Sequence, residues 1–238
     1  MKIRLGKKKS EGKGLVSAVI VAAGSSSRMG GGDKLTAPLG DSTVIAHTLR
    51  AFQASPDVTE IVLVLRKGAE KPALAGASGC DKLGRIVHGG DTRTASAYAG
   101  VMASDPKAEI ILIHDGARPL VTGEVIRRAV EGARKYGAAV PVTAVTDTIK
   151  VGKDGFADST PDRETLFAAQ TPQAFRAELI KAALQDAVDK GLSLTDDCAA
   201  VEKLGMHVKL VEGDARNRKI TLPADLAVAE ILLKEMQK

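Results

Sequence analysis

The sequence has few aromatic residues and only two, widely separated cysteines. Tryptophan is absent, and aromatic residues make up 3% of the 238 positions. A surface that stacks single-stranded nucleic acid needs aromatic side chains, so this kind of site is not expected. Cys80 and Cys198 stand in no metal-ligand spacing, which argues against a zinc site and a disulfide framework.

The sequence also lacks a hydrophobic run long enough to span a membrane. Its first apolar stretch, residues 15–23, is far shorter than the roughly 20 residues that cross a bilayer. It also lacks the length and flanks of a signal peptide. We therefore expect a cytoplasmic protein without a membrane partner, and the chain length suits one α/β domain.

The net charge of +5 is concentrated at the N-terminus. Residues 1–14 carry six basic side chains and one acidic one, whereas the rest of the chain carries 28 of each. We expect a disordered, solvated basic tail over residues 1–14 and a single domain over residues 15–238. Non-specific contact of the tail with nucleic acid or acidic lipid is the alternative, and no specific nucleic-acid partner is expected.

Short apolar runs alternate with segments of helical periodicity. Strands are predicted at 15–21, 60–65, 85–88, 109–114 and 138–143, and helices at 42–54, 92–103 and 122–135. Continuous apolar strands are typical of a sheet that is covered on both faces. The alternation predicts a Rossmann-like α/β fold, in which a mostly parallel twisted sheet carries helices on both faces.

The pattern changes at about residue 143. Residues 143–165 are polar, and a Gly-Lys-Asp-Gly turn at 152–155 predicts a β-hairpin or extended arm that projects from the sheet. Helices are predicted again at 177–190 and 196–204, followed by a strand at 208–211. A last helix is predicted at 223–235, with proline in its first turn.

The loop of residues 22–34 directly follows the first predicted strand, where ligands bind in such sheets. Its glycines let backbone N–H groups approach a ligand, and its serines, Arg28 and Lys34 suit a triphosphate. The loop matches neither the Walker pattern nor the dinucleotide-binding pattern. A flexible surface loop with incidental charges is the alternative.

Two further loops follow predicted strands. Residues 89–96 offer free N–H groups at a helix start for a base or phosphate, unless Asp91 or Thr92 simply caps that helix. Residues 114–119 place Asp115 where it could bind a hydroxyl or a metal-bound water, and Arg118 where it could bind phosphate. The alternatives are a local Asp115–Arg118 salt bridge and a His114 that only packs at the strand end.

The last unusual loop is residues 214–221, which holds three cations within four positions. Read by itself, this loop is better explained as a solvated run of charge than as a binding site.

Taken together, the loops resemble one family. The pattern A-A-G-x-x-x-R-M-G-x-x-x-K at residues 22–34 resembles the signature of sugar-phosphate nucleotidyltransferases. The motifs G-G-D-x-R-x-x-S, H-D-G-A-R-P, D-T-I-K, T-P-Q (residues 171–173), T-D-D and R-K-I-T-x-P-x-D-L follow in order. Over residues 15–236 the set resembles the 2-C-methyl-D-erythritol 4-phosphate cytidylyltransferases of non-mevalonate isoprenoid synthesis.

The resemblance implies transfer of CMP from CTP to 2-C-methyl-D-erythritol 4-phosphate, with release of pyrophosphate. It implies that Arg28 and Lys34 stabilise the transition state. The nucleotide would be bound by Ala22, Ala23, Gly24, Gly90, Asp91 and Ser96. The polyol phosphate would be bound by Asp115, Arg118, Thr148, Arg163, Thr171 and Lys219.

The resemblance further implies a homodimer with composite sites, in which the arm at about 143–165 carries Arg163 to the partner. It implies a divalent cation, usually Mg²⁺, held mainly by the CTP phosphates. Three positions depart from the family pattern: Asp33 replaces proline, Leu35 replaces glutamine and Gly116 replaces alanine. The nearest alternative is a ribitol-phosphate cytidylyltransferase, and the distant one is a non-catalytic nucleotide- or nucleic-acid-binding module.

Overall fold

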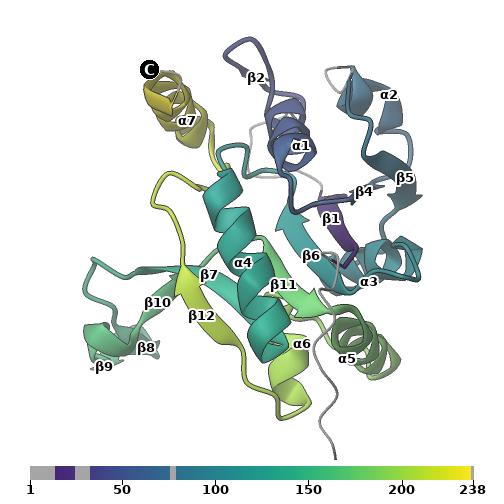
Figure 1. Cartoon of the computed structure of the whole chain (residues 1–238). Coiled ribbons are helices and arrows are strands. Elements are labelled where there is room, and N and C mark those ends of the chain that lie inside the picture. The colour runs from purple at the N-terminus through teal and green to yellow at the C-terminus, as the bar shows by residue number, and fades with distance from the viewer. Residues whose placement is uncertain (1–13, 25–32, 76–78, 237–238) are drawn as a thin grey trace, which may run out of the picture.

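The computed structural model of the chain describes residues 14–24, 33–75 and 79–236. Arg28 and the predicted basic tail up to residue 13 lie outside the described residues. Figure 1 shows one central sheet with helices on both faces and a small hairpin that projects from one side. The predicted α/β fold is therefore confirmed.

Strand β1 (Val16–Ala22) lies near the middle of the sheet. It pairs in parallel with β4 (Glu60–Leu65) and with β6 (Ile110–Asp115), and β4 pairs in parallel with β5 (Leu83–His88). The predicted bounds of these strands agree with the structure to within two residues. The carboxyl ends of β1 and β6 meet where Val21 is the register partner of Asp115.

The other half of the sheet contains strands that the sequence did not reveal. β11 (Gln173–Arg176) lies antiparallel between β6 and β7 (Ala138–Ala144), and β10 (Phe167–Ala169) pairs antiparallel with β7. β12 (Lys209–Glu212) pairs with β7 in parallel. β10 and β11 were missed because they have only three and four residues and β11 is polar at both ends, so their partners rather than their own composition define them.

Alternate residues of β1 face two different apolar clusters. Ala18 and Ile20 face α1 (Val44–Ala54) and α4 (Gly123–Tyr136), while Val19 faces α3 (Arg93–Ala103). The second face is completed by α5 (Ala177–Asp189) and α6 (Cys198–Lys203), and the short α2 (Glu70–Leu74) contributes Ala73 to the first. Both faces of the sheet are covered, as the apolar strands predict.

Threonine side chains begin three of the helices. The hydroxyls of Thr92 and Thr122 accept hydrogen bonds from Ala95 N–H and Val125 N–H, so these residues are the N-caps of α3 and α4. The N-cap of α1 is Thr43, so the helix begins two residues later than the predicted start at residue 42. The reason is local: β2 (Pro38–Leu39) and β3 (Ser42–Thr43) form a small hairpin, and Ser42 pairs with Leu39 in it.

The C-terminal helix α7 (Pro223–Met236) closes a third apolar cluster. Its Ala229 is buried with Leu39, Val44 and Ile220, and Leu233 packs against the same group. The helix therefore fixes the chain directly after the loop that contains Lys219.

The predicted arm is a hairpin of β8 (Val151–Lys153) and β9 (Phe156–Ser159), followed by a 3₁₀ turn at Arg163–Thr165. The turn between the strands contains Asp154 and Gly155, both with positive φ, which is the backbone that such tight hairpins need. Both strands of the hairpin are exposed along their whole length. Figure 1 shows the arm standing away from the sheet beyond β7 and β10.

Candidate functional site

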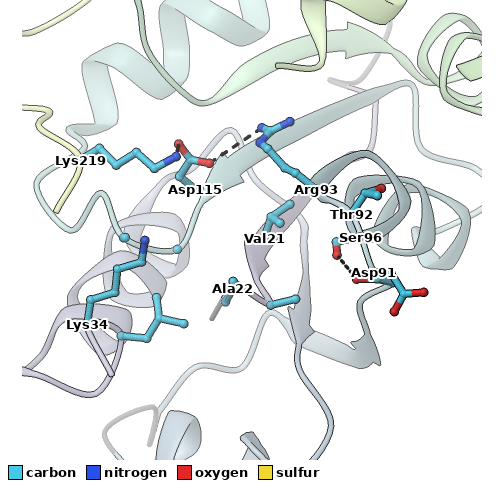
Figure 2. Close-up of a pocket in the computed structure, with 15 residues that line it drawn as sticks. Val21, Ala22, Lys34, Asp91, Thr92, Arg93, Ser96, Asp115 and Lys219 are labelled. Carbon is cyan, nitrogen blue, oxygen red and sulfur yellow. Dashed lines mark hydrogen bonds and ion pairs between the residues drawn. The ribbon is translucent and has the colours of Figure 1, made fainter. Parts of the chain in front are cut away.

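A pocket of about 380 Å³ lies at the carboxyl ends of β1 and β6. Figure 2 shows side chains that line it from several segments far apart in the sequence. The lining residues are Val21, Ala22, Ala23, Gly24, Lys34, Leu35, Gly90, Asp91, Thr92, Arg93, Ser96, Asp115, Gly116, Ala117 and Lys219. The pocket thus unites residues from all four loops that the sequence singled out.

The segment around Gly89 and Gly90 forms one wall of the pocket. Gly89 N–H donates to the Leu65 carbonyl at 2.9 Å, which ties this loop to the end of β4. A Cβ at Gly89 would stand 2.5 Å from both Ala23 Cβ and Ser96 Oγ, so only glycine allows this approach. Ser96 Oγ donates to the Gly90 carbonyl at 3.2 Å, and this fixes the backbone beside Asp91.

Asp115 is the buried acidic group of the pocket, and three cations surround it. Its carboxylate lies 3.0 Å from Lys219 Nζ, 3.4 Å from Arg118 Nε and 3.8 Å from an Arg93 nitrogen. Burial alone would raise the pKa of Asp115, but these three charges hold the pKa far below its ordinary value. The carboxylate is therefore ionised, and the excess of positive charge around it favours an anionic ligand.

Arg93 is held in the pocket wall by a second carboxylate. Two hydrogen bonds of 3.0 and 2.7 Å join its guanidinium to Asp197, which is buried. Burial opposes the charge on Arg93, yet Asp197 and Asp115 together raise its pKa, so it stays protonated. Bidentate pairing of this kind fixes both the position and the plane of the guanidinium.

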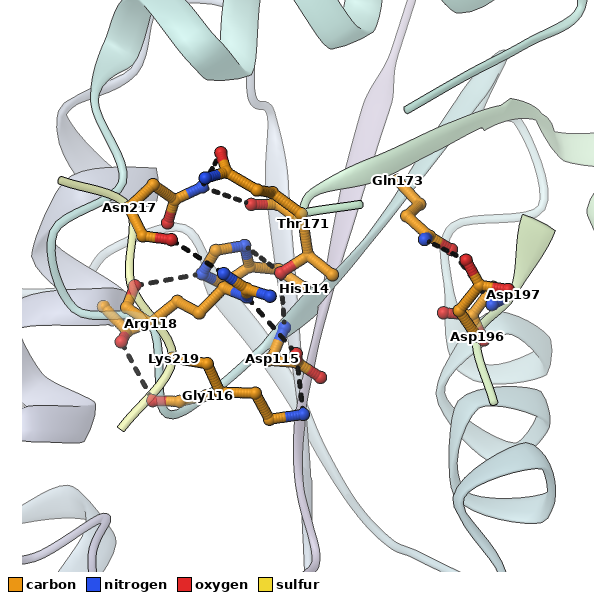
Figure 3. A network of polar contacts seen from close by, with 12 residues as sticks. His114, Asp115, Gly116, Arg118, Thr171, Gln173, Asp196, Asp197, Asn217 and Lys219 are labelled. Atoms are coloured by element: carbon orange, nitrogen blue, oxygen red, sulfur yellow. Dashed lines mark hydrogen bonds and ion pairs between the residues drawn. The ribbon is translucent and has the colours of Figure 1, made fainter. Parts of the chain in front are cut away.

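Gln173 explains why Asp197 lies where Arg93 can reach it. Its side-chain carbonyl accepts hydrogen bonds from the backbone N–H groups of Asp197 and Cys198 at 2.9 and 3.0 Å. Its amide donates to Asp196 at 2.7 Å, as Figure 3 shows. The T-P-Q and T-D-D motifs thus meet at the start of α6, where they support the pocket from behind.

His114 is a packed residue that holds its neighbours in place. Its Nε2 lies 3.2 Å from the Arg118 carbonyl, which can only accept, so Nε2 carries the proton. Its Nδ1 then accepts from Thr171 Oγ1 at 3.0 Å, and that oxygen accepts from Asp115 N–H at 3.1 Å. Burial lowers the pKa of His114 to about 3, so the ring is neutral and aligns Asp115 through Thr171 (Figure 3).

The structure separates the predicted site residues into three groups. Those that line the pocket are Ala22, Ala23, Gly24, Lys34, Gly90, Asp91, Ser96, Asp115 and Lys219. Arg118 and Thr171 lie behind Asp115, where an Arg118 nitrogen donates to the Asn217 carbonyl at 2.7 Å and Thr171 is buried. Thr148 and Arg163 are exposed on the arm, and Arg163 donates to the Thr146 carbonyl at 3.0 Å.

Four residues of the site were not assigned a role from the sequence. Arg93, Gln173 and Asp197 stand in motifs that were noticed, but their contacts join positions 24 to 104 residues apart. Asn217 is fully buried and donates to the Thr171 carbonyl at 2.8 Å, which fastens the last loop to the centre of the site. Such pairings have no signal in a single sequence.

The departures from the family pattern have local explanations. Asp33 accepts a hydrogen bond from Leu35 N–H at 3.1 Å and begins a turn that carries Lys34, and Leu35 is buried in the core. A Cβ at Gly116 would stand 3.0 Å from Ala22 Cβ and 3.1 Å from Ile45 Cδ1. A residue larger than glycine would therefore need small shifts of the pocket floor.

A family model for 2-C-methyl-D-erythritol 4-phosphate cytidylyltransferase matches residues 16–235 of the chain. The chain belongs to this family. The match covers both halves of the sheet, the arm and every described residue of the pocket.

Curated members of the family resemble the chain over nearly its whole length. The chain is 45% identical to the enzyme of Desulforamulus reducens, covering 93% of this chain and 97% of that protein. It is 43% identical to the enzyme of Caldanaerobacter subterraneus subsp. tengcongensis, covering 92% and 99%. Both carry the name 2-C-methyl-D-erythritol 4-phosphate cytidylyltransferase.

Solved structures of family members have the same fold. The synthase of Anaerococcus prevotii, described as a 4-diphosphocytidyl-2C-methyl-D-erythritol synthase, aligns with a TM-score of 0.84 at 33% identity, covering 94% of this chain and all of that one. The Thermus thermophilus cytidylyltransferase aligns with a TM-score of 0.78 at 36% identity, covering 92% and 99%. The chain is accordingly a cytidylyltransferase, a kind of nucleotidyltransferase.

The described residues lack two further features. None of their helices combines the length and apolar character that crossing a bilayer requires. Within the same residues, no group of three or more His, Cys, Asp or Glu side chains is arranged to hold a metal ion.

Proposed function

We propose that this chain transfers CMP from CTP to 2-C-methyl-D-erythritol 4-phosphate in the pocket at the carboxyl ends of β1 and β6. The observation that best supports this proposal is the composition of the pocket. Its glycine-lined wall lies beside the cationic side chains of Lys34, Lys219 and Arg93. The wall provides close backbone approach for a nucleotide, and the cations suit the phosphates of both substrates.

In the proposed reaction, a phosphate oxygen of the polyol phosphate attacks the α-phosphorus of CTP in line. A new P–O bond forms, the bond to the β-phosphate oxygen breaks, and pyrophosphate leaves with its electron pair. The attacking phosphate is already an anionic nucleophile, so the step needs no strong general base. Catalysis then rests on positioning and on charge stabilisation by Lys34 and Arg28.

We assign the polyol phosphate to the side of the pocket formed by Asp115 and Lys219. The ionised Asp115 can accept a hydrogen bond from a substrate hydroxyl, while Lys219, 3.0 Å away, can pair with the substrate phosphate. Arg118 and Thr171 hold Asp115 from behind, which favours an indirect role for both residues in this chain.

A divalent cation, usually Mg²⁺, belongs to the proposal as a ligand of the CTP phosphates. The pocket-lining carboxylates are Asp91 and Asp115, and Asp115 is already paired with cations. This donor set fits an ion that the triphosphate holds with at most one or two protein oxygens. When bound, the ion would neutralise part of the triphosphate charge.

We further propose that the active form is a cytoplasmic homodimer in which each arm serves the partner's pocket. Thr148 and Arg163 are candidate substrate ligands, yet neither belongs to the pocket lining of its own chain. The arm also leaves Phe156 81% exposed and Val151 43% exposed. Apolar side chains gathered on a projecting hairpin support a surface that another chain covers.

The test is a steady-state assay of pyrophosphate release with CTP and either 2-C-methyl-D-erythritol 4-phosphate or ribitol phosphate. We expect kcat/KM to be higher for the methylerythritol substrate. A higher value for ribitol phosphate would overturn the substrate assignment. Absence of pyrophosphate release with both would exclude the enzymatic function and favour a binding module.

A further inference from the structure

Lys219 stands in a loop whose backbone is attached to the body of the protein at both ends. Gly213 N–H donates to a carbonyl of β7 at 2.9 Å, and Ile220 N–H donates to the Ala117 carbonyl at 2.8 Å. Residues 214–219 lie between these attachments. Because a lysine side chain is long and flexible, the position of its ammonium depends on how the backbone of this loop is held.

The side-chain amide of Gln170 holds the first residue of the loop. Its Oε1 accepts from Asp214 N–H at 3.2 Å, and its Nε2 donates to the Asp214 carbonyl at 2.8 Å. These two contacts fix the orientation of the amide, because a backbone N–H only donates and a backbone carbonyl only accepts. Gln170 thus pairs with the backbone of Asp214 much as a neighbouring strand would.

Gln170 is itself fixed by the sheet. It directly follows β10, its side chain is buried, and its own N–H donates to the Pro141 carbonyl of β7 at 2.8 Å. The loop also comes unusually close, since a Cβ at Gly213 would stand 2.6 Å from Gln170 Oε1 and 2.9 Å from the Val142 carbonyl oxygen. Glycine at this position therefore allows the contact between the amide and the loop.

Asn217 makes a second attachment from the middle of the loop. Its Nδ2 donates to the Thr171 carbonyl at 2.8 Å (Figure 3) and to Gln170 Oε1 at 3.3 Å. The opposite orientation of this amide would turn its oxygen toward two acceptors. Among the described residues, the buried Asn217 Oδ1 has no hydrogen-bond partner, which lowers the stability of the fold. The Asn217 amide therefore attaches the loop at a cost in stability.

We propose that Gln170 is a positioning residue for the polyol phosphate, which acts through the loop of residues 214–219 on Lys219 and does not touch the substrate. The inference rests on the proposed role of Lys219. Of the described residues, Lys219 lines the pocket and lies 3.0 Å from the Asp115 carboxylate, whereas Gln170 does not line it. Release of the loop would move the Lys219 ammonium and leave the glycine-lined wall of the pocket in place.

The experiment is a double-mutant cycle with four proteins: wild type, Gln170→Met, Lys219→Met and the double variant. Methionine keeps the approximate length of glutamine but lacks the amide that pairs with the Asp214 backbone. The kcat and the KM of each substrate are measured by pyrophosphate release. Urea unfolding of each protein shows that it is folded under the assay conditions.

We expect Gln170→Met to raise the KM of the polyol phosphate by about tenfold, because a displaced loop misplaces Lys219. The KM of CTP should stay within about twofold of wild type. In the Lys219→Met background, Gln170→Met should change the KM of the polyol phosphate by less than about twofold, since the ammonium on which it acts is absent.

Two results would overturn the proposal. A full tenfold effect of Gln170→Met in the Lys219→Met background would show that Gln170 acts by another route, such as Thr171 and Asp115. Equal increases in the KM of both substrates would show a general disturbance of the pocket.

Gln53→Met is the matched control. The side-chain amide of Gln53 also holds a backbone group, because its Oε1 accepts from Lys82 N–H at 2.9 Å, and Gln53 does not line the pocket. This substitution should leave the KM of both substrates unchanged. An equal rise in the polyol-phosphate KM of Gln53→Met would overturn the proposal, since the position of Gln170 would then have no special importance.

A second substitution keeps the test usable if Gln170→Met does not fold. Gln170→Glu keeps the shape of the side chain and an oxygen that can accept from Asp214 N–H, but it loses the amide donor. In the same cycle, we expect it to raise the KM of the polyol phosphate, and not that of CTP, by a smaller factor. An effect on both substrates alike would again contradict the proposal.

The role of Lys219 and the role of Gln170 fail in different ways. If Lys219→Met leaves the KM of the polyol phosphate unchanged, the proposed role of Lys219 is wrong and the inference built on it fails as well. If Lys219→Met raises this KM and the Gln170 variants do not, the inference alone is wrong.

Discussion

Asp115 and Arg163 are both assigned to the polyol phosphate, yet their surroundings are opposite. Asp115 is 8% exposed and is held by the sheet, by Thr171 and by three cations. Arg163 lies on an arm of exposed residues and contacts the backbone of that arm at Thr146. One residue is positioned by the core of its own chain, whereas the other would act on the pocket of a second chain in the proposed dimer.

The comparison distinguishes two ways of building a site. In the pocket, charged residues are placed by buried hydrogen bonds that also contribute to folding. On the arm, a charged residue such as Arg163 does not pack against the core. Its removal should therefore change function without changing the stability of the monomer. The predictions below test this division, beginning with the largest effect.

Lys34→Ala should reduce kcat by about 100-fold or more, because a preorganised charge on the transferring phosphoryl group is lost. The measurement is pyrophosphate release at saturating CTP and polyol phosphate. Arg50→Ala is the control, since Arg50 is a half-exposed surface residue outside the pocket lining. Near-normal turnover of Lys34→Ala would remove this residue from the site.

His114 should make the body of the protein sensitive to acid. Its pKa is about 3 in the folded chain against an ordinary value of 6.5, so the unfolded chain binds the extra proton first as pH falls. Stability is therefore lost from about pH 6.5 downward, by about 2 kcal/mol between pH 7 and pH 5. Urea unfolding at both pH values measures it.

The control for this effect is His114→Gln, which should be less stable at pH 7 but should lose much less between pH 7 and pH 5. An equal loss in wild type and variant would show that His114 is not the titrating group. Asp115 acts in a different window, because its lowered pKa contributes stability that is lost only when the pH falls below about 4.

Arg163→Ala should raise the KM of the polyol phosphate by about tenfold and change that of CTP less, because a charge-assisted contact to one substrate is lost. Mixing Arg163→Ala chains with Lys34→Ala chains then tests the composite site. The assay uses polyol phosphate well below its wild-type KM, where Arg163→Ala homodimers keep only about a tenth of the activity. After subunit exchange, half of the dimers are hybrids with one intact site each, so about a quarter of wild-type activity should return. Activity equal to the average of the two parents would contradict an arm that acts on the partner.

The smallest expected difference is in the free energy of unfolding, between a threonine variant in the body and a threonine variant on the arm. Thr92→Ala removes the cap of α3, whose hydroxyl accepts from Ala95 N–H at 3.0 Å, and should cost about 1 kcal/mol. Thr160→Ala removes a hydroxyl that accepts from Lys150 Nζ on the arm and should cost less than about 0.5 kcal/mol. Thermal unfolding of the two variants at low protein concentration measures both. Equal losses would mean that the arm belongs to the folding unit of the body.

The helices and strands that could be predicted from the sequence are those whose own residues show a hydrophobic run or a helical periodicity. Strand β4 and helix α3 were placed to within one residue, because an apolar run and a helical period identify them without their partners. β11 was missed although it lies inside the sheet, since a four-residue strand with glutamine and arginine at its ends has no such pattern.

The candidate site likewise contains residues that the sequence identified and residues that it did not. Lys34, Asp115 and Lys219 were found because each stands in a loop of unusual composition or in a motif. The pairing of Arg93 with Asp197, and the support of Asp197 by Gln173, joins distant positions that only folding brings together. The contact of Asp33 with Arg66 likewise joins residues that are 33 positions apart in the chain.

The arm leaves and re-enters the sheet at a single point. Ala144 is the register partner of Phe167, and Val145 N–H donates to the Leu166 carbonyl at 3.3 Å. Residues 145–166 can therefore be excised and replaced by a two-residue turn that joins β7 directly to β10. We expect the shortened chain to keep Lys34, Asp115 and Lys219 in place and to lose the contact that the arm makes in the proposed dimer, so the arm becomes a part that can be removed and added back separately.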